Sequence, residues 1–187
     1  MTAERERPVD GPTDEMLVQA VGSGQTEALH TLVQRHQDKA RRFARHMLRD
    51  GDAADDVAQD VFLRVHAAAH KYQSRGRFNS WFYRIATNLC LDHLRRAKRR
   101  PARLTVAVAD PSAPEASDTL ARSETIQRVR KAVDELPERQ RVVVILHRYQ
   151  GLSHEDISAT TGWSRSAVES LLVRAYAHLR ETLADLL

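Results

Sequence analysis

Residues 152–174 constrain the fold more than any other stretch, because they predict two short helices joined by a tight turn. Ser153 can cap the first of these helices through its hydroxyl group. Gly162 can adopt the left-handed conformation that ends this helix after about Thr161, and Ser164 can cap the second helix. This combination of caps and a glycine turn is typical of a helix-turn-helix unit.

The second helix of this unit has two different faces. Its apolar residues recur at helical spacing, at Val168, Leu171, Leu172, Ala175, Leu179 and Leu183. The opposite face is polar and narrow enough to enter a DNA major groove, where base edges can be read. The candidate DNA-binding residues there are Ser164, Arg165, Ser166, Glu169, Ser170, Val173 and Arg174. In the alternative interpretation, these residues form only the solvated side of an ordinary amphipathic helix. The glycine turn and the two caps favour DNA readout.

Positive charge is concentrated in one segment of the 187-residue chain, whose formal net charge is +4. Between residues 71 and 100 the only acidic residue is Asp92. The basic residues of this segment are Lys71, Arg75, Arg77, Arg84, Arg95, Arg96, Lys98, Arg99 and Arg100. Such a concentration of cations is the footprint expected of a protein that binds a polyanion.

Aromatic residues lie in or beside this basic segment, at Tyr72, Phe78, Trp81 and Tyr83. Aromatic faces that alternate with cations are suited to stacking on single-stranded bases. Core packing is the competing explanation, and we favour it for Trp81 and Phe82. Tyr72 and Phe78 lie in or next to a predicted loop, so we expect them to be open to base contact.

A predicted helix from about residue 53 to residue 70, capped by Asp52, carries an acidic patch in an otherwise basic protein. The patch consists of Asp55, Asp56, Gln59 and Asp60. The helix dipole could by itself explain acids in the first turn, such as Asp55 and Asp56. Asp60 lies too far along the helix for this explanation, so we interpret the patch as a contact surface.

No catalytic or metal-binding set of residues stands out. His66 and His70 lie one helical turn apart and could share a metal ion, but no third ligand is near them. The single cysteine, Cys90, is interpreted as a small core residue, and it excludes an internal disulfide bond. Because no nucleophile, acid pair or glycine-rich phosphate loop occurs at usable spacing, we predict neither an enzyme nor a cofactor.

The sequence favours a cytoplasmic protein that does not enter a membrane. No apolar run approaches the roughly 20 residues that span a bilayer. The charged N-terminus lacks the apolar core of a signal peptide, and sparse cysteine fits a reducing compartment.

The apolar periodicity predicts an all-α fold of two small helical domains joined by a flexible linker, with the helix-turn-helix in the second domain. We expect a flexible arm over residues 1–12 and a first helical domain over 13–100. The stretch 101–119 contains alanine, proline, serine and small acids without helical periodicity, and it predicts the linker. The second domain then covers residues 120–187.

Three sequence runs together resemble the bacterial extracytoplasmic-function, or group four, sigma factors. The run LPERQRVVVILHRYQGLSHEDISATTGWSRSAVESLLVRAYAHLRETL is similar to sigma region four. The runs DDVAQDVFLRVH and FNSWFYRIATNLCLDHLRRAKRR are similar to sigma region two. Their order across a linker, without a region-three domain, makes the resemblance specific.

This resemblance implies a role for each predicted surface. The patch of Asp55, Asp56, Gln59 and Asp60 would bind core RNA polymerase. The region-two residues that would capture and melt the minus-ten element, including flipped non-template bases, are Lys71, Tyr72, Arg75, Arg77, Phe78, Asn79, Trp81, Arg84, Asn88, Asp92, Arg95 and Arg96. Region four would read the minus-thirty-five element as duplex DNA, and an anti-sigma factor is the expected regulatory partner.

A conventional repressor or activator with a helical dimerisation domain is the rival interpretation. It would explain the second domain equally well, but it leaves Asp60 and the basic aromatic segment unexplained. The chain departs from the family pattern at Glu169, where lysine or arginine is frequent, and at the polar Thr161. A relative's promoter sequence therefore does not transfer to this chain.

Overall fold

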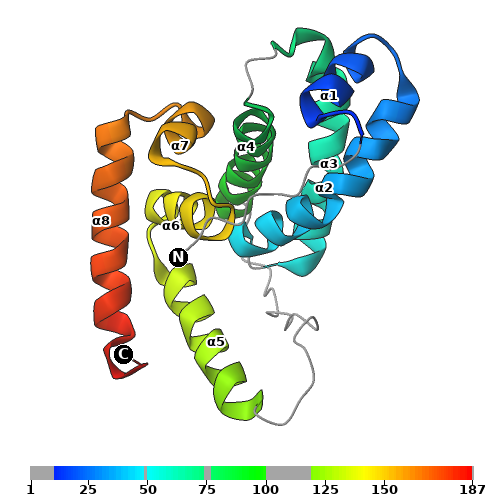
Figure 1. The fold of residues 1–187 in the computed structure, drawn as a ribbon. Helices are drawn as coiled ribbons and strands as arrows, with labels where there is room; N and C mark the ends of the chain where they lie inside the picture. Colours follow the sequence, from blue (N-terminus) through cyan, green and yellow to red (C-terminus); the bar gives the residue numbers. More distant parts are fainter. Residues whose placement is uncertain (1–10, 49, 74–76, 100–118, 187) are drawn as a thin grey trace.

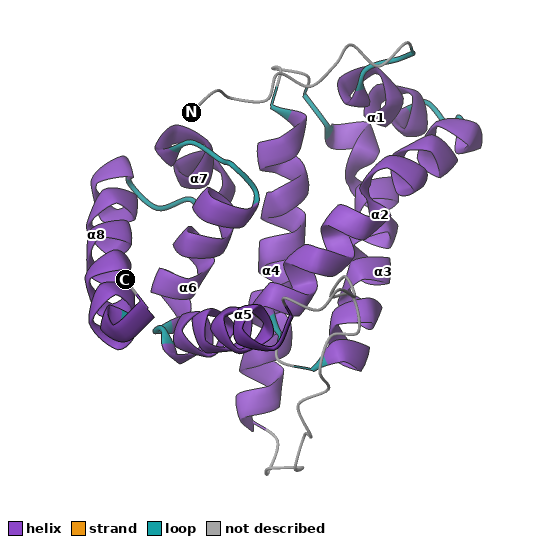
Figure 2. Ribbon diagram, turned by 60° about the horizontal axis from the view of Figure 1, so that its bottom comes forward, coloured by secondary structure: helices purple, strands orange, loops and turns teal. Residues whose placement is uncertain are grey.

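The computed structural model describes residues 11–48, 50–73, 77–99 and 119–186, and all regular structure in these ranges is helical (Figures 1 and 2). This all-helical architecture confirms the predicted fold class. The predicted arm, apart from residues 11 and 12, lies outside the described residues. So does the predicted linker, apart from Thr119.

The first bundle contains four helices and a short 3-10 turn. They are α1 (Asp14–Gly22), α2 (Thr26–Met47), α3 (Gly51–Ala68), η1 (Ala69–Lys71) and α4 (Phe78–Arg99). Their apolar faces meet in a core whose largest fully buried side chains include Phe43, Phe82, Leu32 and Met47. At Gly22 a β-carbon would come within 2.8 Å of the Ala69 carbonyl oxygen, so glycine permits α1 to approach η1 closely.

The predicted cap of α3 was wrong by two residues. Asp50, in an extended conformation, accepts a hydrogen bond from the Ala53 amide at 3.1 Å, and the helix begins at Gly51. Asp52 therefore lies inside the first helical turn, where its own backbone is helical. An N-cap residue needs an extended backbone, so Asp50 takes this role.

The second bundle contains the remaining helices. They are α5 (Thr119–Glu135), α6 (Glu138–Val144), the π-helical segment η2 (Ile145–Tyr149), α7 (His154–Thr161), α8 (Arg165–Thr182) and η3 (Ala184–Leu186). Val142, Ile145, Leu146, Ile157 and Val168 are fully buried and form its centre. Figure 1 shows α8 at the outer edge of the molecule, with α6 and α7 between α8 and α4.

The helix-turn-helix forms with the caps that the sequence predicts. Ser153 accepts a hydrogen bond from the Asp156 amide at 3.1 Å, and Ser164 accepts one from the Ala167 amide at 3.2 Å. Gly162 has a φ of 75°, the left-handed conformation that a glycine adopts without strain. The unit formed by α7 and α8 is therefore confirmed.

Thr161, the polar residue in this turn, is satisfied locally. Its hydroxyl group donates to the Ile157 carbonyl at 2.7 Å and accepts from the Trp163 amide at 3.3 Å. The Ser158 hydroxyl also donates to the Trp163 carbonyl at 2.6 Å. The turn thus replaces an apolar contact with side-chain hydrogen bonds to its own backbone.

Candidate functional site

The polar face of α8 is exposed, and its apolar face is buried. Val168, Leu172 and Ala175 point into the second bundle and are nearly inaccessible to solvent. Of the predicted DNA-binding residues, the fully exposed ones are Ser164, Arg165, Ser166, Ser170, Val173 and Arg174, while Glu169 is half-buried. Val173 is 69% exposed, although it is apolar. The structure therefore brings all seven residues onto one accessible surface, the α8 reading face.

Side chains on the α8 reading face are ordered by local contacts. Arg165 Nε donates to Glu169 Oε1 at 3.0 Å, and His154 Nδ1 of α7 lies 3.6 Å from the same oxygen. Arg174 donates to the Ser170 backbone carbonyl and to its hydroxyl group, both at 3.2 Å. The hydrogen bond from Arg165 lowers the pKa of Glu169, so this carboxylate stays ionised at neutral pH. The sequence analysis did not single out His154.

The basic segment is displayed along α4. Lys71, Arg77, Asn79, Arg84, Asn88, Asp92, Arg95 and Arg96 are exposed, and Arg75 lies outside the described residues. Arg77, Arg84, Asn88 and Arg95 follow one another at seven- and four-residue steps, which places them on one side of the helix. Asp92 accepts a hydrogen bond from Arg95 at 3.0 Å.

The prediction that Phe78 is open to base contact was wrong. Helix α4 begins at Phe78 itself, so the side chain points into the first bundle and is only 3% exposed. Its ring centroid lies 5.7 Å from Phe82 and 5.1 Å from His36. Tyr72 and Trp81 remain half-buried and pack edge to face at 4.9 Å, so they are the accessible aromatic pair of this segment.

The acidic patch on α3 divides into two parts. Asp55 is half-buried, and its Oδ1 lies 3.3 Å from Arg41 Nε and 3.5 Å from Arg45 Nη2 of α2. These ion pairs direct Asp55 towards the bundle. Asp56, Gln59 and Asp60 are instead exposed.

Leu63 belongs to the same exposed surface, which the sequence analysis missed. It follows Asp60 by three residues and Gln59 by four, so it lies on their side of α3. The side chain is 68% exposed. A leucine at a position where the helical pattern expects a polar residue was the available signal. We call Asp56, Gln59, Asp60 and Leu63 the α3 outer face.

The two bundles pack against each other through α4 and α7, an arrangement that the sequence did not predict. Arg77 Nη2 donates to Glu155 Oε1 at 2.8 Å, and the Ser80 hydroxyl donates to Asp156 Oδ1 at 3.2 Å. The buried Thr160 hydroxyl donates to the Ser80 carbonyl at 3.3 Å. Hydrogen bonds therefore link the first helix of the helix-turn-helix to the start of α4.

A second set of contacts extends this α4–α7 interface to Gln150, which precedes α7, and to Glu138 of α6. The Tyr83 hydroxyl, in a residue that is only 4% exposed, donates to Gln150 Oε1 at 2.5 Å. Burial raises the pKa of Tyr83 to about 12, with nearby Arg42 opposing the shift, so the hydroxyl remains a donor. Lys98 and Glu138 form an exposed ion pair at 2.9 Å.

A small cavity of about 160 Å³ lies between the bundles beside these contacts. Asn88 and Arg95 of α4 line one side, and Arg139, Thr161 and Trp163 of the second bundle line the other. Two residues predicted to bind DNA thus face the second bundle. Both side chains are also exposed, Arg95 to 62%, so the cavity covers only part of each.

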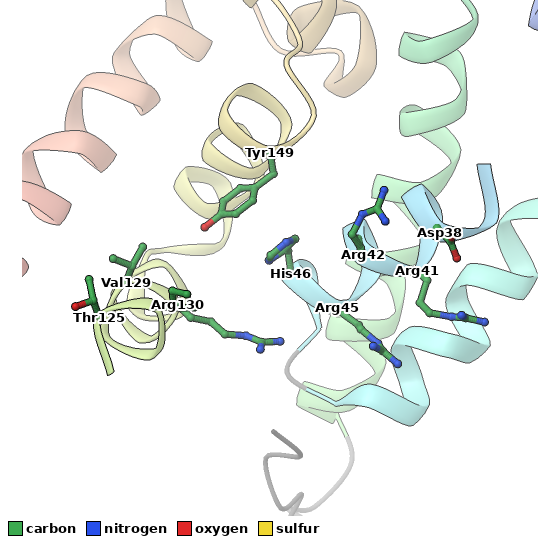
Figure 3. Close-up of a pocket in the computed structure, with 10 residues that line it drawn as sticks. Asp38, Arg41, Arg42, Arg45, His46, Thr125, Val129, Arg130 and Tyr149 are labelled. Carbon is green, nitrogen blue, oxygen red and sulfur yellow. The ribbon is translucent and has the colours of Figure 1, made fainter. Parts of the chain in front are cut away.

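A larger groove of about 580 Å³ opens between α2 and α5 (Figure 3). Its charged lining comes from both bundles and consists of Asp38, Arg41, Arg42, Arg45 and Arg130, together with His46. Figure 3 shows Arg130 extending from α5 towards α2. Ile126 and Tyr149, which are 56% and 40% exposed, add apolar surface. This α2–α5 groove is therefore both cationic and apolar.

Metal-binding and nucleophilic chemistry have little support in the described part of the chain. No group of three or more histidine, cysteine or acidic side chains with metal-binding geometry occurs in that part. Cys90 is fully buried, as predicted, and burial raises its pKa to about 12, which keeps the thiol protonated. None of the described helices is long and apolar enough to cross a membrane.

Comparison with protein families matches both bundles. Residues 32–100 match the Sigma-70 region 2 family, and residues 126–179 match the Sigma-70 region 4 family. The chain is 35% identical over 174 residues to the ECF RNA polymerase sigma factor SigM of Mycobacterium tuberculosis (strain ATCC 25618 / H37Rv). The aligned stretch covers 93% of this chain and 86% of SigM.

Two further similarities extend over nearly the whole chain. The RNA polymerase sigma-H factor of Pseudomonas aeruginosa is 30% identical over 184 residues, covering 93% of this chain and 95% of that protein. Among solved structures, CnrH in complex with the cytosolic domain of CnrY matches with a TM-score of 0.69 and 27% identity. That match covers 92% of this chain and 97% of the CnrH chain.

Proposed function

The chain belongs to the extracytoplasmic-function (ECF) family of RNA polymerase sigma factors, and from this premise we propose which surface carries each step of its function. As a sigma factor it binds core RNA polymerase, directs it to promoters for transcription initiation, and is not itself an enzyme. The assignments below concern the residues that perform these steps.

The α8 reading face reads the minus-thirty-five element as duplex DNA. The observation that carries this assignment is a capped helix with one buried apolar face and seven accessible residues opposite it. The N-terminal residues of such a recognition helix contact base edges in the major groove. Arg165 and Arg174 supply positive charge for the phosphates that flank this groove.

The exposed side of α4 captures the minus-ten element. The half-buried pair of Tyr72 and Trp81 offers aromatic surface on which an unpaired base can stack. Asn88 can hydrogen-bond a base edge, and the cations along α4 attract the phosphates. Phe78 is not part of this surface because it belongs to the core.

The α3 outer face binds core polymerase. Three polar residues adjoin an exposed leucine. The leucine offers an apolar contact, and the neighbouring acidic residues impose charge complementarity. The expected polymerase surface is therefore basic around an apolar centre. Asp55 supports this face indirectly, since its ion pairs hold α3 against α2.

The packed arrangement of the two bundles is the closed form of the sigma factor. In support, Arg77 is engaged by Glu155, and Asn88 and Arg95 face the cavity between the bundles. The α8 reading face remains exposed in the same arrangement. Separation of the bundles would free these side chains from the second bundle and give the minus-ten strand full access to them.

An anti-sigma factor regulates the chain by contacting both bundles. The α2–α5 groove favours an acidic, amphipathic helix, because its lining combines arginines with exposed apolar side chains. The similar protein CnrH has been solved in complex with the cytosolic domain of CnrY. We expect the chain to act in the cytoplasm, where the polymerase is.

Transcription in vitro tests the assignment as a whole. Core polymerase is mixed with the full chain and with a promoter library randomised at both elements, and the transcribed sequences are read. We expect two conserved blocks at a fixed spacing and a stoichiometric complex with core polymerase. A conventional regulator would give a single block and no such complex.

A further inference from the structure

Glu169 is the only acidic residue on the α8 reading face. It lies in the second turn of the helix, among the N-terminal residues that approach base edges. A carboxylate at this place is repelled by the DNA phosphates, which lowers the affinity for every sequence. We therefore expect the carboxylate to make a base contact that requires a hydrogen-bond acceptor.

The two contacts of Glu169 leave one oxygen available. Arg165 Nε at 3.0 Å and His154 Nδ1 at 3.6 Å both approach Oε1. Within the described residues, no hydrogen bond or ion pair reaches Oε2. The side chain is 44% exposed, so Oε2 can meet a base edge. Arg165 and His154 come from different helices and together fix the carboxylate, and the Arg165 guanidinium offsets part of its charge.

The chemistry of the major groove then selects one base. Guanine presents two acceptors there and thymine presents an acceptor and a methyl group, so a carboxylate is repelled by both. Adenine presents an amino donor beside the N7 acceptor, whereas cytosine presents only its N4 amino donor. We propose that Glu169 determines specificity at one position of the minus-thirty-five element by accepting a hydrogen bond from cytosine N4.

This inference rests on the proposed role of α8 in reading the minus-thirty-five element. The competing explanation is that Arg165 and Glu169 form only an exposed ion pair at i, i+4 spacing. Such pairs contribute little to stability, and this one would then have no effect on base preference. The two explanations predict different outcomes for a promoter selection.

The experiment uses holoenzyme assembled from core polymerase and the full chain. The holoenzyme selects bound DNA from a library randomised only in the minus-thirty-five element. The wild type is compared with Glu169→Ala and with Glu169→Gln, because glutamine can pair with adenine N6 and N7. Glu181→Gln is the matched control, since it removes the same charge near the exposed C-terminal end of α8.

We expect the wild type to prefer cytosine at one position. Glu169→Ala should reduce this preference on the order of tenfold, Glu169→Gln should shift it towards adenine, and Glu181→Gln should leave it unchanged. The inference would be overturned if the holoenzyme still preferred cytosine with either Glu169 substitution. It would also be overturned if the Glu169 variants only bound all promoter sequences more tightly, to the same extent as Glu181→Gln. If the wild-type holoenzyme selects no block at this distance, the role of α8 itself is refuted.

Discussion

Loosening the α4–α7 interface should open the sigma factor without unfolding either bundle. The double substitution Ser80→Ala and Tyr83→Phe removes the hydrogen bonds to Asp156 and Gln150. Tyr83→Phe keeps the ring that packs against Phe43 at 5.4 Å, so the first bundle retains its core. The change therefore acts on the contact between bundles.

The size of the effect follows from the two hydrogen bonds that are lost. A bond between neutral groups, such as that of Tyr83, contributes about 0.5–1.5 kcal/mol, and a bond to a carboxylate such as Asp156 contributes about 1.5–3 kcal/mol. Together they favour the closed form by about 2–4.5 kcal/mol. The ratio of closed to open molecules should fall by a factor of about 30 to 2000.

Distances between spin labels measure this ratio directly. Labels are attached at His66→Cys on α3 and Ala177→Cys on α8, two exposed positions outside the proposed binding surfaces. Cys90 should not compete for the label, because it is buried and its pKa is raised to about 12. The wild type should give one short, narrow distribution, and the double variant a broad and longer one.

A control pair separates this effect from a general loss of hydroxyl groups. Ser23→Ala and Tyr176→Phe remove one serine and one tyrosine hydroxyl away from the α4–α7 interface. These substitutions should leave the distance distribution unchanged. If the double variant of Ser80 and Tyr83 gives the same distribution as this control, the hydrogen bonds do not hold the closed form and the reasoning is refuted.

Three further predictions address the other surfaces and the core. Asp56→Lys with Asp60→Lys should weaken core polymerase binding at least tenfold in a titration, because it places like charges opposite a basic surface. Asn88→Ala should lower open-complex formation, followed by permanganate reactivity, more than closed-complex binding, since a base contact contributes about 1–3 kcal/mol. Asp14→Asn should destabilise the first bundle at pH 7 and progressively less as the pH falls below about 4, as measured by chemical denaturation.

Asp14 stabilises the first bundle at neutral pH through its contacts with α2. Burial alone would raise the pKa of Asp14, but hydrogen bonds from His36 at 2.7 Å and Arg35 at 3.1 Å lower it below the ordinary 3.8. A carboxyl with a depressed pKa stabilises the fold above its unfolded pKa, and this contribution is lost as the pH falls. The variant and the wild type should therefore converge in acid.

Each of these predictions has a result that contradicts it. Equal core affinity in the lysine variant, against a Glu181→Lys control, would remove the α3 outer face from polymerase binding. If Asn88→Ala reduced closed-complex and open-complex formation equally, Asn88 would contribute to general DNA affinity and not to strand capture. A constant difference in unfolding free energy between pH 3 and pH 7 would show that the Asp14 carboxylate is not the stabilising group.

The features of the fold that the sequence could predict were those determined by local interactions, such as helix caps and tight turns. Ser153, Gly162 and Ser164 act within three or four residues of their own position, so their chemistry could be read without tertiary structure. At Phe78 the error was a small shift of the helix start, because the residue was expected in or next to a loop but is the first residue of α4. Because side-chain direction rotates by about 100° per residue in a helix, that small shift moved the ring from the surface to the core.

The interface between the bundles was beyond such reasoning. Ser80 and Asp156 are 76 residues apart, and Tyr83 and Gln150 are 67 apart. Each of these side chains is plausible on a solvated helix face, and only the packed arrangement makes them partners. Leu63 was different, since its position on a polar face was visible in the sequence but was not weighed against the acidic patch.

The closed form covers the two proposed DNA-binding surfaces unequally, and this predicts an order of events. The α8 reading face is exposed while the bundles are packed. Arg77, just before α4, and Asn88 and Arg95 within α4 are also exposed, but they contact or border the second bundle. Duplex readout therefore does not require opening, whereas we expect opening to give an unpaired strand full access to these residues. Since α3 presents its outer face in the closed form as well, core polymerase can bind before the bundles separate. Because the α3 outer face is equally accessible in both forms, this contact alone does not shift the balance between them. Opening is therefore driven by contacts that only the open form makes, with other polymerase surfaces or with the unpaired strand, and these contacts couple strand capture to holoenzyme assembly.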